Sequence, residues 1–141
     1  MPMGGPDSLS QDSDGVRSKN SNGDLNLSEL NINDIEGLSE YWRYMHPAFQ
    51  WRVATIHLDH NKIESLTKAN SFRALASMYP RDNNIPGVYA LVLSDNKIVE
   101  INPVVFNDLP DLRVVDLSNN PLSEENKQRL RAAHPNKLFR F

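Results

Sequence analysis

The most chemically versatile side chains of the sequence lie together at positions 57–60, in the run His-Leu-Asp-His. Imidazole and carboxylate groups are ordinary ligands of zinc and related metals, and Asp95 and Asp116 are further carboxylates in similar sequence surroundings. The spacing of His57, Asp59 and His60 matches no known metal-ligand motif, however. We therefore predict no metal site and no cofactor.

A histidine beside an aspartate also raises nucleophilic catalysis, for which Ser94 and Ser118 are the available hydroxyls. Both serines fall in stretches with a strand pattern. The sequence shows neither the sharp turn that exposes a nucleophilic serine nor a loop suited to an oxyanion hole. We predict no catalytic residue and a protein that is not an enzyme.

Composition narrows the remaining classes. The 141 residues include no cysteine, which excludes disulfide scaffolds, cysteine-ligated zinc and thiol chemistry. A formal net charge of −3 gives no reason to expect nucleic acid as a partner. No stretch approaches the roughly 18 apolar residues of a membrane helix, and the N-terminus lacks the apolar segment of a secretory signal. We expect no membrane association.

The strongest feature is an internal repeat. Eleven-residue segments that begin at Val53, Val88 and Leu112 align without gaps, each as apolar-x-x-apolar-x-Leu-x-x-Asn-x-apolar. The fourth and sixth positions alternate along a short strand, so both face one side and form a core. The shared asparagines have donors and an acceptor that can satisfy the backbone of a buried turn. We predict that they form a structural ladder of Asn61, Asn96 and Asn120.

This pattern resembles the leucine-rich-repeat family. The resemblance implies the α/β class and a short solenoid of about three repeats, with parallel strands on a concave face that binds proteins. It also implies a protein partner, a monomer, and a cytoplasmic location, since extracellular members carry cysteine-rich caps that this chain lacks.

An alternative follows from the closing segment NPLSEENKQRLRAAHP, which is similar to repeats of bacterial effectors. The Ser-, Asn- and Gly-rich N-terminus also looks like a type III secretion leader. The alternative function is a secreted effector, or a targeting or regulatory subunit of an enzyme system, that enters a host cell without a classical signal peptide.

The predicted organisation has three parts. Residues 1–24 are too polar to offset the cost of ordering and form a disordered tail. Residues 25–52 form an N-terminal helical cap, with a helix over 34–45 and a degenerate earlier strand among Leu25, Leu27, Leu30 and Ile32.

Residues 53–141 hold the repeats and a C-terminal cap. A convex helix is expected from Phe72 to Tyr79, inside a long insert between the first two repeats. Ser123 is the expected N-cap of a helix over 124–134 whose Leu130 and Ala133 face inward, followed by a closing strand.

Stacked repeats align equal positions into rows, and the rows predicted on the concave face are His57–Val92–Asp116, Asp59–Ser94–Ser118 and His60–Asp95–Asn119. Tyr89 and Arg113 lie alongside and are the first choices for anchors, because interfaces favour these residue types. The predicted partner-binding residues are His57, Asp59, His60, Tyr89, Val92, Asp95, Arg113 and Asp116.

Overall fold

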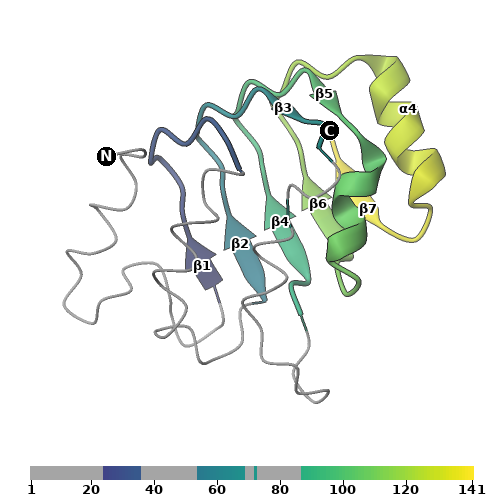
Figure 1. Ribbon diagram of the computed structural model, residues 1–141, viewed down its shortest axis with the longest axis horizontal. Coiled ribbons are helices and arrows are strands. Elements are labelled where there is room, and N and C mark those ends of the chain that lie inside the picture. Colours follow the sequence, from purple (N-terminus) through teal and green to yellow (C-terminus); the bar gives the residue numbers. More distant parts are fainter. Residues whose placement is uncertain (1–23, 36–53, 69–71, 73–86) are drawn as a thin grey trace.

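The computed structural model describes residues 24–35, 54–68, 72 and 87–141. These residues form a five-stranded sheet in the order β1-β2-β4-β6-β7, and Figure 1 shows its strands side by side. Every pair in the sheet is parallel. The strands are β1 (Asp24–Asn26), β2 (Thr55–His57), β4 (Ala90–Val92), β6 (Val114–Asp116) and β7 (Leu138–Arg140).

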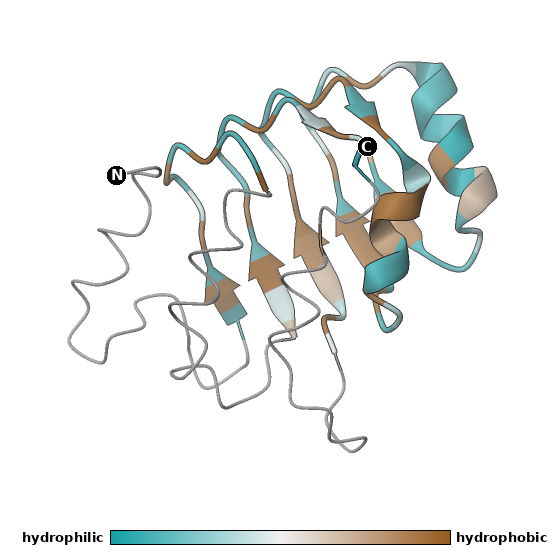
Figure 2. Cartoon of the chain, viewed as in Figure 1, coloured by the Kyte–Doolittle hydropathy of each residue, from teal (hydrophilic) through white to brown (hydrophobic). Residues whose placement is uncertain are grey.

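The register places one buried side chain at the centre of each strand, between two side chains that are partly or fully exposed. This alternation follows from the two-residue period of a strand, and Figure 2 shows apolar residues along each arrow. A second buried row follows two residues later. The two rows are Leu25–Ile56–Leu91–Val115–Phe139 and Leu27–Leu58–Leu93–Leu117.

The expected early strand is present as β1, which pairs with β2 through Leu25 and Ile56. The segment predicted as a helical cap therefore begins with a strand and turn of the repeat sheet. Ile35 is buried, but the rest of the helix expected over 34–45 lies outside the described residues. The division into tail, cap and repeats stays a prediction.

The convex side returns the chain from one strand to the next. A two-stranded parallel sheet joins β3 (Ser65–Leu66) to β5 (Glu100–Ile101), and the 3-10 helix η2 (Pro103–Asp108) follows. Asn102 caps η2 by accepting a hydrogen bond from the Val104 amide at 3.2 Å. Phe106 is buried and stacks on buried Phe72, with the ring centroids 5.8 Å apart. The remainder of the helix expected over 72–79 lies outside the described residues.

The C-terminal cap follows the sequence prediction closely. Ser123 caps α4 (Glu124–Ala133), its Oγ accepting from the Asn126 amide at 3.0 Å, and Leu130 is buried. The prediction for Ala133 is wrong, because this residue is exposed. The second buried residue of α4 is Asn126, whose side chain bonds both the amide and the carbonyl of Ile101.

The closing strand β7 packs aromatic rings against the last turn. The ring centroid of Phe139 lies 6.0 Å from that of Phe106 and 5.8 Å from that of Phe141, on which it stacks. The guanidinium carbon of Arg131 lies 4.6 Å from the centroid of the Phe141 ring. These contacts cover the apolar side chains that an open repeat end would expose. No helix among the described residues is long and apolar enough to cross a membrane.

Candidate functional site

The three asparagines of the repeat form the predicted ladder. The Asn96 side chain donates to the Leu58 and Leu93 carbonyls, both at 3.0 Å, and accepts from the Ile63 amide at 3.1 Å. Asn61 and Asn120 repeat this arrangement one turn earlier and one turn later. Each asparagine therefore bonds its own turn and the preceding one. Asn61 and Asn96 are buried and Asn120 is half-buried, and the bonds of all three hold the turns in place.

The residue before each ladder asparagine adopts a left-handed backbone. His60, Asp95 and Asn119 have φ values of 57°, 58° and 60°, and Glu29 has the same conformation at the corresponding place after β1. Such a φ is uncommon outside glycine and is most accessible to Asn, Asp and His. These turns place His60, Asp95 and Asn119, which belong to one predicted row, at the edge of the sheet where the strands end.

One of the rows predicted on the concave face, His57–Val92–Asp116, lies in the strand register, which also extends it. His57, Val92 and Asp116 are direct partners across β2, β4 and β6. The same row continues to Asn26 on β1 and to Arg140 on β7. Sequence reasoning missed these two end positions because the outer strands lack the asparagine of the repeat motif.

His60 lies at the centre of a charged cluster with Asp59 and Asp95. Its Nδ1 lies 2.9 Å from an Asp59 carboxylate oxygen, and its Nε2 lies 3.6 Å from Asp95. The hydrogen bond with Asp59 raises the pKa of His60 above 6.5; desolvation opposes this shift, and the charges of Asp95 and Asp59 add smaller increases. Asn119 donates to Asp95 at 3.1 Å, which completes the predicted row.

Metal binding and nucleophilic catalysis are the two kinds of chemistry considered for this region. Among the residues that the structure describes, no three His, Cys, Asp or Glu side chains are grouped to hold a metal ion. Ser118 donates its hydroxyl to Asp116 at 2.7 Å, and Ser94 is buried. His57 has Asp24 as its neighbour, with Nε2 3.9 Å from the carboxylate.

Tyr89 and Arg113, the predicted anchors, are neighbours at the opposite edge, where the strands begin. The Arg113 amide donates to the Tyr89 carbonyl at 2.8 Å, and the Tyr89 side chain is 53% exposed. Lys137 and Leu138 continue this edge on β7 and its preceding loop, and Leu138 is 60% exposed. Sequence reasoning missed both. Pairing the expected closing strand with β6 places Leu138 opposite Val114 and therefore Lys137 beside Arg113.

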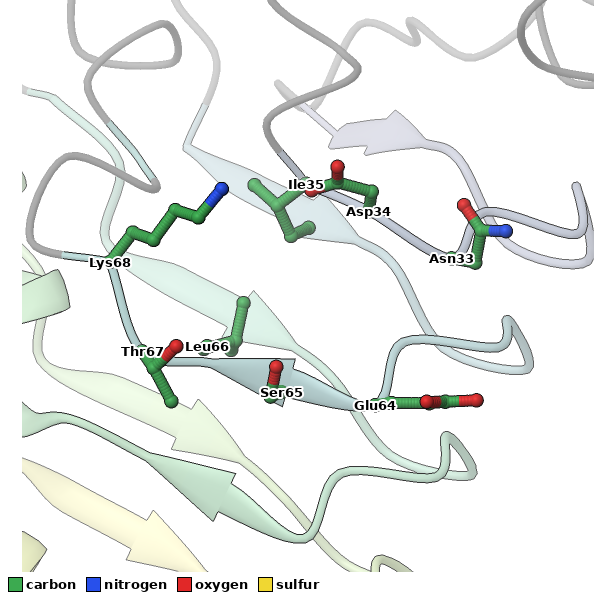
Figure 3. Close-up of a pocket in the computed structure, with 8 residues that line it drawn as sticks. All are labelled: Asn33, Asp34, Ile35, Glu64, Ser65, Leu66, Thr67 and Lys68. Carbon is green, nitrogen blue, oxygen red and sulfur yellow. The ribbon is translucent and has the colours of Figure 1, made fainter.

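A hollow of about 350 Å³ lies on the convex side. Figure 3 shows its two walls, residues 33–35 and residues 64–68, facing each other. Its charged residues, Asp34, Glu64 and Lys68, are of both signs. The Glu64 carbonyl also accepts a hydrogen bond from the Val99 amide. The hollow is a gap between successive convex returns, and it is separate from the concave face.

The parallel sheet, its repeating register and the asparagine ladder define a short leucine-rich-repeat solenoid. A comparison with protein families agrees: the family described as leucine rich repeat matches residues 86–131. No curated protein matches the chain. Leucine-rich-repeat domains are typically protein-interaction modules and typically non-catalytic. Neither comparison supports the effector-like resemblance, which stays a prediction.

Proposed function

We propose that the protein is a non-enzymatic interaction module that binds a protein partner through its concave face. The observation that carries this proposal is that two sets of side chains, the asparagine ladder and the row on the sheet face, have different surroundings. The ladder asparagines are committed to buried backbone groups, whereas the row of His57, Val92 and Asp116 is aligned on the solvent-facing side. A regular, laterally aligned surface of this kind suits the binding of another protein.

The test is capture of partners by immobilised protein, measured by quantitative mass spectrometry. Two arginines at the centre of the face, His57→Arg with Val92→Arg, are expected to block docking by their size. The matched control places the same side chains on the convex side, Val99→Arg with Glu100→Arg, where both residues are exposed. Thermal melting confirms that each variant is folded, because His57 and Val92 are half-buried and lie opposite each other on neighbouring strands.

Loss of the captured proteins in the concave variant alone supports the proposal. Equal capture by the concave variant and the wild type would refute the assignment of the concave face.

A further inference from the structure

Two cations converge on one carbonyl at the edge where β6 and β7 begin. Arg113 Nη1 and Lys137 Nζ each donate to the Leu112 carbonyl oxygen at 3.1 Å. Arg113 also donates to the Pro110 carbonyl at 3.3 Å. Within the described ranges, no carboxylate lies at ion-pair distance from either side chain. Partial burial and, secondarily, the charge of Arg113 lower the pKa of Lys137, as expected for a cation held near another cation.

The two cations border a hollow of about 420 Å³, whose remaining wall is the loop that joins α4 to β7. Ala133 and Pro135 give this wall an apolar part. His134 also lines it, but its Nε2 donates to the Pro103 carbonyl at 2.8 Å. The polar groups that the hollow offers to a ligand are therefore chiefly cationic.

Two residues with exposed apolar side chains are backbone neighbours of Arg113. Tyr89 lies on one side of Arg113, with its carbonyl accepting the Arg113 amide, and Leu138 lies on the other, with its amide donating to the Arg113 carbonyl at 2.7 Å. Tyr89 and Leu138 are 53% and 60% exposed. We call Tyr89, Arg113, Lys137 and Leu138 together the cationic edge.

Charge is distributed unevenly across the sheet face. Acidic side chains accompany β1, β2, β4 and the turns after them, namely Asp24, Glu29, Asp59 and Asp95. On the β6 and β7 side, Arg113, Lys137 and Arg140 accompany Asp116 and Asp111, and the Asp111 carboxylate accepts a hydrogen bond from the Gly87 amide at 2.8 Å. An extended anionic surface, such as a membrane or a polynucleotide, would meet repulsion from the acidic half. A short acidic segment that docks on this side meets more cations than carboxylates.

From this geometry we propose that the cationic edge binds an acidic peptide segment of the partner. A carboxylate of the segment bonds Arg113 and Lys137, and a neighbouring apolar side chain packs against Tyr89. The proposal rests on the proposed function and adds the chemistry of the partner. The carboxylate replaces water at the two cations, and the apolar contact gives the segment its register.

The experiment selects binders from a random peptide library displayed on phage, with the intact chain as bait. Selected peptides are then synthesised, and their affinities are measured by fluorescence anisotropy. The test variant reverses both charges, Arg113→Glu with Lys137→Glu. The matched control, Lys62→Glu with Lys97→Glu, makes the same change of charge at two exposed lysines away from the cationic edge. Thermal melting confirms that each variant is folded.

The expected peptides combine Asp or Glu with an adjacent aliphatic or aromatic residue. Their binding should weaken at least about tenfold in the test variant, the loss that corresponds to one charge-assisted hydrogen bond, and should stay unchanged in the control. Replacing the peptide carboxylate by lysine should restore binding to the test variant. This exchange of charges requires direct contact between the peptide and the cationic edge.

Three outcomes would overturn the proposal: no selected peptide, peptides without acidic residues, or acidic peptides that bind the test variant as well as the wild type. Binding of phosphatidylserine vesicles in place of peptides would overturn it also. The proposed function fails separately, through the capture experiment with His57→Arg and Val92→Arg. Partner capture that depends on those residues but not on Arg113 and Lys137 would leave the proposed function standing and refute the cationic edge.

Discussion

The asparagine ladder predicts a large and position-specific loss of stability when its central member is removed. Asn96 is buried and lies between the turns that contain Asn61 and Asn120. In the variant Asn96→Ala, the Ile63 amide loses its side-chain partner, whereas the Leu58 and Leu93 carbonyls lose one bond each and keep those that they accept from Asn61 and Asn120. Alanine is too short to replace any of these bonds, and the turns are too closely packed to admit solvent freely.

The magnitude follows from one orphaned amide and one lost hydrogen bond at each of two carbonyls. A buried polar group left unpaired costs about 2 kcal/mol and a lost hydrogen bond about 0.5 kcal/mol, which together give about 3 kcal/mol. A domain is stable by about 5–15 kcal/mol in total, so the variant loses a large share of the whole. At roughly 3 °C for each kcal/mol in a chain of this size, the melting temperature should fall by about 10 °C.

The assay is thermal and urea unfolding followed by circular dichroism. The neighbouring variant Lys97→Ala is the control, because the Lys97 side chain is exposed and its change should stay within about 0.5 kcal/mol. A loss below about 1 kcal/mol in Asn96→Ala would refute the reasoning. It would mean that water or a shifted backbone satisfies these groups at little cost.

Two further predictions concern the cap and the charged cluster. Phe106→Ala should lower the free energy of unfolding by about 3–5 kcal/mol in urea titrations, because the ring is buried and packs against both Phe72 and Phe139; a loss under about 1 kcal/mol would contradict this packing. The raised pKa of His60 means that the folded state binds its proton more tightly, so the stabilisation is complete below pH 6.5 and disappears as the pH rises through the folded-state pKa. NMR titration should give a His60 pKa above 6.5 that falls in Asp59→Asn, and an unchanged value in that variant would contradict the hydrogen bond.

The repeat core could be predicted because its determinants are local. Each strand needs only two inward apolar residues and one asparagine at fixed spacing, and the register then follows from stacking identical units. The ladder residue Asn96 and the helix cap Ser123 were predictable for the same reason, since each is defined by neighbours within a few positions.

The parts that sequence reasoning missed depend on contacts between distant segments. Nothing in the sequence around Lys137 indicates that its amine shares the Leu112 carbonyl with Arg113, because this contact requires β7 to lie beside β6. Ala133 was placed inward by its helical spacing. Ala133 shares a helical face with buried Asn126 but lies in the last turn of α4, where it is exposed. The bonds between Asn126 and the Ile101 backbone depend on a distant segment, and a helical period cannot reveal them.

The direction of the ladder explains how β1 joins the sheet without the repeat asparagine. Each ladder side chain bonds the turn before its own, as Asn61 does when it accepts from the Leu30 and Ile32 amides and donates to the Leu27 carbonyl. Leu30 occupies the position after β1 that corresponds to Asn61, and it is buried. The asparagine that holds a turn belongs to the next repeat, and for that reason a strand without the motif still joins the sheet.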